Sequence, residues 1–490
     1  MRFPACACCQ PRTPILPGGR RSLLKAAAAG LAGGLVAPLR ARTANAQASR
    51  GRRILIRGGT VLTMEPGLPD LPRGDVLVEG ERIAAVGPSL DVADAEVIDA
   101  GGMIVMPGFV DTHRHLWESL LRNILPDGTL QQYLASILNR LGPAYRPEDV
   151  FAGNLLGALG ALDAGVTTVL DWSHIQNSPA HTDAAIAALR EAGIRAVFGY
   201  GAPQLGRRWW ETEGHPYPGD LARVRRQHIS GSDGLLTLAL AASGPLFGTV
   251  DVAEREWRVA REVGARISTH AGVGPASRGN LARFAAKGLL GPDTTYIHCN
   301  FFDAEEWRLV AGSGGTVSLS PQIELQMGHG NPVVQATLDA GLRPSLSVDA
   351  ETSVPSDMFT QMRAAFASQR GEGNARAHRK EPGAPPLLTA TEVLRFATLD
   401  GARANGLDGQ VGSLRPGKQA DIVLLRADRI NVLPVNDPVG AVVTGMDTSN
   451  VDTVMVAGAT RKRHGALVGV DLNRVADLVA RSRRSVLASL

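Results

Sequence analysis

The chain has 490 residues, of which 44% are hydrophobic and 20% charged, a composition typical of a folded enzyme rather than a disordered chain. Its net charge of +4 arises in the first 48 residues, which hold seven Lys and Arg and no acid. The rest of the chain carries 44 basic and 47 acidic residues, so its own charge is about −3. The main body therefore offers no strongly basic surface, and we expect no nucleic-acid partner.

The first 48 residues have the three-part order of a bacterial export signal. Arg20 and Arg21 precede a short apolar run over residues 26–36, and two small-residue cleavage sites follow at residues 44–46 and 46–48. The paired arginines resemble a twin-arginine signal. The apolar run is about half of the roughly 20 residues that a bilayer requires, so we expect no stable membrane span. The prediction is a signal peptide over residues 1–48, the twin-arginine export machinery as a partner, and a periplasmic or secreted mature protein.

Short β-branched segments stand at both ends of the remaining chain. Residues 54–98 contain several such runs, each bounded by Gly, Pro or Asp, which is the pattern of an antiparallel sheet. The same pattern returns in residues 420–425 and 451–456. We therefore predict one small β-sandwich domain built from residues 50–102 and 406–465, followed by a C-terminal helix over residues 466–490.

Between these segments, apolar strands alternate with Ala- and Leu-rich amphipathic stretches. Residues 152–164, for example, have the helical pattern, and the apolar run from Val166 to Leu170 follows them. Such alternation predicts an α/β fold, a TIM-like (β/α)8 barrel over residues 103–405, with Met103 to Met106 as its first strand. No Gly-x-Gly-x-x-Gly turn follows a strand, so a dinucleotide-binding fold lacks support. In such barrels the chemistry occurs at the C-terminal ends of the strands.

Four predicted strand ends carry side chains that bind metal ions. The first strand leads into His113 and His115, which are two residues apart and therefore point to the same side of an extended segment. Later strands end in His270, His298 and Asp349, and their spacing places them at strands 5, 6 and 8. Nitrogen and oxygen ligands of this kind suit a divalent metal, Zn²⁺ or Fe²⁺, with one coordination position left for water.

These residues and their neighbours resemble the amidohydrolase superfamily, in its branch of cytosine and guanine deaminase-like enzymes and chlorotriazine hydrolases. The matching segments run from Pro107 to Leu116, Ile297 to Asn300, Asn331 to Asp349 and Gly412 to Val423. The resemblance implies a set of metal ligands: His113, His115, His270 and Asp349. It also implies that Asp349 is the general base and that His298 supports the metal or the attacked group. Two-metal relatives use a carboxylated Lys on strand 4, and residues 235–245 contain no Lys, which favours one metal.

Five further residues near the predicted strand ends are candidates for the substrate pocket. They follow the His pair, strand 2 or strand 7: Trp117, Glu118, Trp172, His174 and His329. Flat side chains can stack on a ring, and polar ones can hydrogen-bond to it. Three of these residues also have a structural alternative, since Trp172 could pack against a loop, His174 could cap a helix and His329 could face solvent.

The predicted function is a metal-dependent hydrolase of carbon–nitrogen bonds other than peptide bonds, with metal-bound water attacking a small cyclic, aromatic or amide substrate. Deaminases of this branch usually carry a Glu three residues after the strand-5 His, where it protonates the ring. Here that position is Val273, which cannot exchange a proton, and Glu118 is the nearest other acid by sequence. We therefore expect amide-type hydrolysis rather than simple ring deamination.

Two other functions stay open at this point. One is a deaminase of a nitrogen heterocycle, and the other is a noncatalytic exported binding protein on the same scaffold. The five polar ligands argue against the second, because such groups buried together without a metal are costly. The sequence is also compatible with a homo-oligomer.

Overall fold

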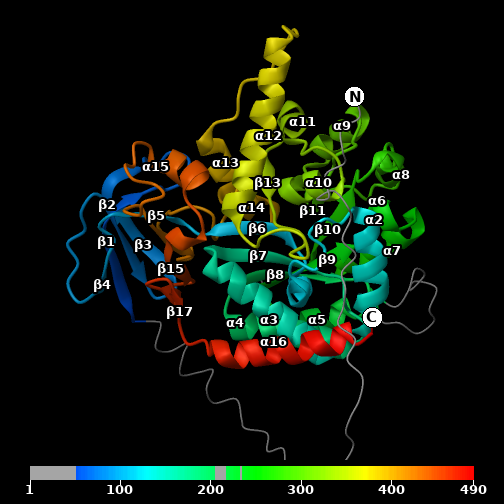
Figure 1. Ribbon diagram of the computed structural model, residues 1–490, viewed down its shortest axis with the longest axis horizontal. Coiled ribbons are helices and arrows are strands. Elements are labelled where there is room, and N and C mark those ends of the chain that lie inside the picture. The colour runs from blue at the N-terminus through cyan, green and yellow to red at the C-terminus, as the bar shows by residue number, and fades with distance from the viewer. Residues whose placement is uncertain (1–50, 205–216, 232–233, 490) are drawn as a thin grey trace, which may run out of the picture. The chain divides into compact units, whose positions relative to one another are not determined.

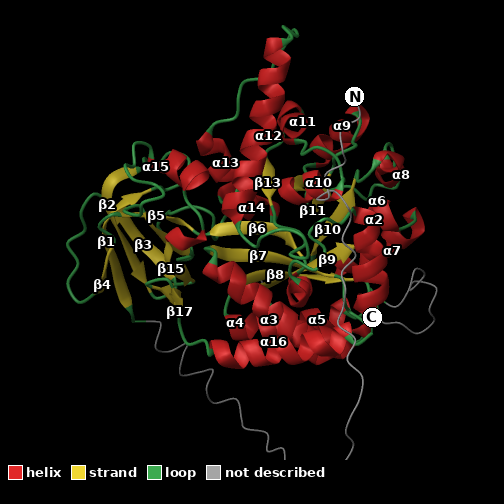
Figure 2. Cartoon of the chain, in the orientation of Figure 1, coloured by secondary structure: helices red, strands yellow, loops and turns green. Residues whose placement is uncertain are grey.

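The computed structural model describes residues 51–204, 217–231 and 234–489 (Figure 1). The predicted signal peptide, with Arg20 and Arg21, lies outside these residues. The described chain contains an eight-stranded and a nine-stranded sheet, which Figure 2 shows as yellow arrows among red helices. The predicted TIM-like barrel with a smaller β domain is therefore confirmed.

The eight-stranded sheet is the barrel, and all of its neighbouring strands run parallel. A bridge between Arg114 and Asp349 joins its first strand to the segment after its last strand. Nearly every strand residue is buried, because side chains fill the inside and helices cover the outside. In chain order the strands are β6 (Phe109–Arg114), β7 (Val166–Ser173), β8 (Arg195–Gly201), β9 (Leu236–Ala242), β10 (Arg266–Ala271), β11 (Thr294–His298), β12 (Thr316–Leu319) and β13 (Pro344–Leu346).

Helices connect the barrel strands. In α9 (Ala304–Ser313) the sequence sets both ends, since Asp303 caps the first turn and Gly314, with φ of 72°, ends the last. The other longer helices are α3 (Pro147–Asp163), α4 (Pro179–Ala192), α7 (Val250–Glu262) and α12 (Met358–His378). The shorter ones are α2 (Leu130–Tyr133), α5 (Leu221–Gln227), α6 (Gly244–Phe247), α8 (Leu281–Ala286), α10 (Pro321–Met327), α11 (Val334–Asp339), α13 (Ala390–Phe396), α14 (Leu399–Ala404) and α15 (Pro438–Gly440). Short 3-10 or π segments are η1 (Leu116–Leu121), η2 (Leu134–Leu141), η3 (Gly142–Ala144), η5 (Pro275–Ser277), η6 (Ala441–Gly445) and η7 (Thr448–Asn450).

The nine-stranded sheet combines segments from both ends of the described chain. Its strands are β1 (Arg53–Val61), β2 (Leu71–Glu79), β3 (Arg82–Gly87), β4 (Glu96–Asp99), β5 (Met103–Pro107), β14 (Ile422–Arg426), β15 (Val451–Val456), β16 (Ala459–Arg463) and β17 (Ala466–Leu467). The sheet is mixed rather than purely antiparallel, because β1 pairs in parallel with β4 and β5.

Two boundaries differ from the sequence prediction. Residues 103–106, predicted as the first barrel strand, form most of β5, which lies between β1 and β14 in the nine-stranded sheet. The chain changes sheets at Gly108, whose N–H donates to Asp421 O, whereas the N–H of Phe109 donates to Gly165 O. At the other end, residues 466–467 are strand β17. The C-terminal helix α16 (Leu472–Leu487) starts only after its Asp471 cap, and it packs against α3 (Figure 1).

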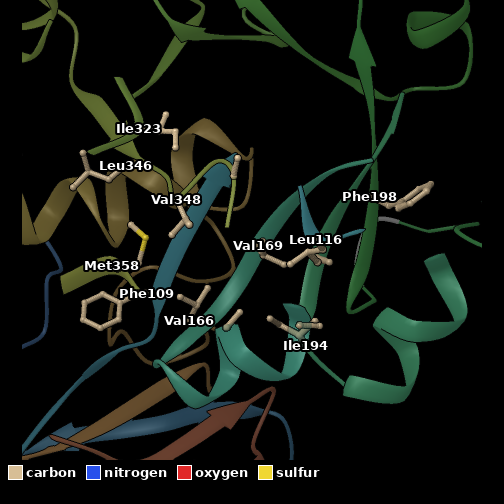
Figure 3. Packing of buried hydrophobic residues seen from close by; sticks show 14 of the residues in the cluster. Phe109, Leu116, Val166, Val169, Ile194, Phe198, Ile323, Leu346, Val348 and Met358 are labelled. Atoms are coloured by element: carbon tan, nitrogen blue, oxygen red, sulfur yellow. The ribbon is translucent and has the colours of Figure 1, made fainter. Parts of the chain in front are cut away.

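Both apolar and charged contacts stabilise the barrel. Figure 3 shows part of its core, with Phe109 near Met358 and with Val166 and Val169 on β7. A buried ion pair joins β8 to the nine-stranded sheet, since Arg195 contacts Asp421 through two nitrogens at 2.9 and 3.0 Å. No described helix is both long enough and apolar enough to span a membrane.

Candidate metal centre

Four histidines and one aspartate meet at the C-terminal ends of four barrel strands. His113 lies on β6 and His115 directly after it, His270 lies on β10, His298 ends β11 and Asp349 follows β13. These strands are the first, fifth, sixth and eighth of the barrel, as the spacing predicted. The fold therefore brings together all five residues that the sequence singled out as ligands or as catalytic.

The Asp349 carboxylate lies among these imidazoles. Its Oδ1 is 3.2 Å from Nε2 of His113 and 3.2 Å from Nε2 of His115, and its Oδ2 is 3.6 Å from Nε2 of His298. The ring centroids of His113 and His270 are 4.8 Å apart. Ligand atoms of His113, His115 and Asp349 lie within 4.8 Å of one another, and so do those of His113, His270 and His298. Such a spacing could hold a metal ion.

The chemistry of the donor set fits a cation. Burial lowers the pKa of His113 to about 3, so its ring is neutral. Nδ1 of His113 and Nδ1 of His270 are buried without a hydrogen-bond partner among the described residues. Burial opposes the charged form of His115, but Asp349 and Glu118 outweigh it and raise its pKa to about 9. The neutral ring nitrogens lie near a carboxylate, and the region favours a positive charge. A bound cation would provide a partner for the nitrogens and for the carboxylate at the same time.

The surroundings favour a single metal. The fourth barrel strand, β9, contains no Lys that could be carboxylated to bridge two ions. His115, Glu118 and His174 form another group of metal-binding residues, but it shares His115 with the first group and is not an independent site.

Glu324 holds His298 in place. Nδ1 of His298 is 3.0 Å from Oε1 of Glu324, which also accepts the N–H of Ser320 at 2.8 Å. Because the carboxylate engages Nδ1, Nε2 of His298 faces Asp349. Sequence reasoning missed Glu324, which lies on the short helix α10 with no periodic signal to distinguish it.

A cavity of about 350 Å³ opens onto the metal centre, a volume that suits a small ligand. Three of the predicted pocket residues, Trp172, His174 and His329, line it. Both ring nitrogens of His329 are buried without a partner among the described residues, and burial lowers its pKa to about 3. Much of the remaining wall is apolar and includes Leu130, Leu134, Leu138, Leu246, Phe247, Val273 and Met327, with polar contributions from Tyr133, Asn139, Gln204 and Ser243.

Trp117 and Glu118 do not line this cavity, which corrects their assignment to the pocket. Both lie on η1 and are completely buried. Trp117 packs against the Tyr145 ring and donates to Nδ1 of His174 at 3.3 Å. Glu118 accepts a hydrogen bond from Tyr133, and it is Tyr133 that reaches the cavity. The reason is tight packing of η1 on α3, where a Cβ on Gly153 would be 2.3 Å from the carbonyl oxygen of Trp117.

A parallel barrel with metal-binding side chains at its strand ends is suited to metal-dependent hydrolysis. Residues 104–461 match the model of the amidohydrolase family, and the chain belongs to this family. It is a hydrolase that uses a divalent metal and acts on carbon–nitrogen bonds other than peptide bonds. A hydrolytic enzyme, rather than a noncatalytic binding protein on this scaffold, fits these observations.

Relatives cover most of the chain. The 5'-deoxyadenosine deaminase of Methanothermobacter thermautotrophicus is 31% identical over 443 residues, which span 87% of this chain and 96% of the relative. The 5-methylthioadenosine/S-adenosylhomocysteine deaminase of Moorella thermoacetica is 28% identical over 441 residues, 86% of this chain and 97% of the relative.

Solved structures share the fold over a similar length. Zinc-bound atrazine chlorohydrolase TrzN from Arthrobacter aurescens TC1 is 25% identical, with a TM-score of 0.76 over 88% of this chain and all of that one. A zinc-bound adenosine deaminase from Xanthomonas campestris is 23% identical and also has a TM-score of 0.76, over 90% of this chain and 99% of that one.

Proposed function

We propose that this chain is a zinc-dependent hydrolase of small amides and related carbon–nitrogen compounds. Four side chains would hold the zinc: His113, His115, His270 and Asp349. Zinc is favoured over Fe²⁺ because it suits nitrogen and oxygen donors and because related structures contain it. The choice of an amide substrate is based on one observation: the residue three positions after His270, which lines the cavity, is Val273.

The bound metal would supply Lewis acidity to the carbonyl oxygen and to water. Asp349 is suited to the proton transfers. Burial opposes its ionisation, but the imidazoles of His113 and His115 hold its pKa well below the usual range. The carboxylate is therefore ionised, which is the form that can accept the proton of the attacking water and return it to the departing nitrogen. His298, held by Glu324, lies beside Asp349, where it can steady the attacked group.

Val273 occupies a position at which ring deamination needs a proton donor. Displacing an amino group from an aromatic ring is helped by a proton on the ring nitrogen, and Val273 cannot supply one. Asp349 is the only carboxylate among the described residues that line the cavity, and it already serves as the base. Breaking an amide bond needs no ring proton, so the apolar wall at Val273 is compatible with amide hydrolysis.

A second candidate is deamination of an adenosine-type heterocycle. The names of the two relatives favour it, and Trp172 and His174 offer flat side chains to a ring. The two functions are separated by measuring amine and ammonia release from zinc-loaded enzyme with N-acyl amines, ureas, purines, pyrimidines and triazines. We expect turnover of amide-type compounds, and efficient release of ammonia from adenosine would overturn this choice.

We also propose that the enzyme is exported through the twin-arginine route, on the basis of Arg20 and Arg21 before the short apolar run. Replacing both with Lys should retain the precursor in the cytoplasm, whereas the parent chain should appear in the periplasm without its first 48 or so residues. Parent protein that still starts at Met1 in the cytosol would contradict this proposal.

A further inference from the structure

Ser243 is the polar residue that follows the fourth barrel strand. β9 ends at Ala242, which pairs with Thr269 of β10, so Ser243 lies level with His270. Ser243 lines the cavity together with Phe247 of α6, and the Phe247 ring lies 5.8 Å from the His270 ring. Ser243 is therefore next to a candidate metal ligand and borders the space that a substrate fills.

A buried carboxylate behind the cavity sets the direction of the Ser243 hydroxyl. Glu256 on α7 is completely buried and accepts two hydrogen bonds from Ser243, the hydroxyl to Oε1 at 2.9 Å and the backbone N–H to Oε2 at 3.1 Å. The Tyr217 hydroxyl donates a third bond to Oε1 at 2.7 Å. Three donors directed at one carboxylate stabilise a group that would be costly to bury alone.

This arrangement fixes the polarity of Ser243 toward a ligand. A serine hydroxyl has one hydrogen and two lone pairs, and the ionised form of Glu256 takes the hydrogen. The oxygen can then offer only lone pairs to the cavity. We propose that Ser243 is a specificity-determining hydrogen-bond acceptor for an N–H group of the substrate. It would select amides, ureas or amines whose nitrogen carries hydrogen, and it would disfavour esters and fully substituted amides.

The amide part of this proposal rests on the proposed function, but the polarity of Ser243 can be tested by binding alone. The probes are oxindole and N-methyloxindole, flat lactams in which a methyl group replaces the N–H hydrogen, titrated into zinc-loaded enzyme by calorimetry. The parent enzyme should bind oxindole more tightly, on the order of tenfold, because the methylated lactam leaves Ser243 without a donor. Equal binding of the two lactams, or no binding of either at millimolar concentration, would overturn the proposal.

Two variants test whether Ser243 is the source of the preference for oxindole. Ser243→Ala removes the acceptor and should reduce the preference to about threefold or less. In Glu256→Gln the new amide can donate to the Ser243 oxygen, which releases the hydroxyl hydrogen and should reduce or reverse the preference. Glu306→Gln is the matched control, because Glu306 is a buried carboxylate that caps α9 outside the cavity.

An unchanged preference in Ser243→Ala would refute the role of Ser243. Circular dichroism and thermal melts show whether each variant folds, and if Glu256→Gln does not fold, the small substitution Ser243→Ala decides the question. Failure of the proposed function would instead appear as absent amide hydrolysis by the parent enzyme, with the lactam preference intact.

Discussion

Val273→Glu would place an acid where the cavity wall is now apolar. Val273 is only 6% exposed, so the new carboxyl would be largely buried. Burial raises the pKa of a carboxyl group, as it does for Glu118 and Glu256, which both have a pKa of about 7 in this protein. A Glu at this position would therefore be partly protonated near neutral pH, and its acid form could donate a proton to a ring nitrogen.

The expected gain follows from the value of a general acid. A positioned acid contributes roughly 10²–10⁴ in rate, and a cavity of about 350 Å³ leaves room for the longer side chain. We expect kcat/KM for ammonia release from adenosine to increase by about 10² or more. Burial of the carboxyl should lower the free energy of unfolding by roughly 1–3 kcal/mol.

The assay is ammonia release from adenosine at matched zinc content. Val273→Gln is the control, because it has nearly the same size but no proton to give. The new activity should decrease as the pH rises through about 7, because the acid form of the new Glu is lost. Equal deamination by Val273→Glu and Val273→Gln, or efficient deamination by the parent enzyme, would refute the reasoning.

Three further predictions concern the metal centre and the fold. Asp349→Asn should lower kcat by about 10²–10⁴ with little change in KM, as measured by steady-state kinetics, and near-normal turnover would exclude its role as the base. His113→Ala should lose bound metal and activity together, whereas stoichiometric metal in the purified variant would contradict its assignment. Arg195→Met should lower the free energy of unfolding by roughly 3–5 kcal/mol in urea denaturation, because it leaves Asp421 buried without its partner. Arg474→Ala, which breaks an exposed ion pair, is the control and should cost about 0–1 kcal/mol; an equal loss in both variants would argue against the buried pair.

The metal centre could be predicted because, in a barrel, the spacing of residues along the sequence indicates where they lie in the fold. Each parallel strand with its helix takes a similar length of chain, so a polar residue at the end of a β run indicates both its strand and its end of the barrel. His270, His298 and Asp349 were placed in this way. The boundary at residues 103–106 was missed, because a strand in the outer sheet and a strand in the barrel have the same apolar pattern.

Residues that act through other side chains were beyond such reasoning. Glu324 and Glu256 lie on helices, and their roles depend on which side chain faces them across the tertiary fold. Trp117 and Glu118 show the reverse case, since their sequence position beside the His pair suggested the pocket. The packing of η1 against α3 buries both of them behind it.

The backbone conformation at the strand ends is another feature that the sequence pattern did not predict. His298, Cys299 and Asp349 have φ values of 74°, 57° and 70°, a region that non-glycine residues rarely adopt. At Asp349, bonds to the neighbouring segment maintain this conformation, since its N–H donates to the His113 carbonyl at 2.9 Å and its carbonyl accepts the His115 N–H at 3.1 Å. The same bonds hold both His113 and His115 against the Asp349 carboxylate. The barrel thus offsets a local backbone cost and holds the donor atoms in place relative to one another.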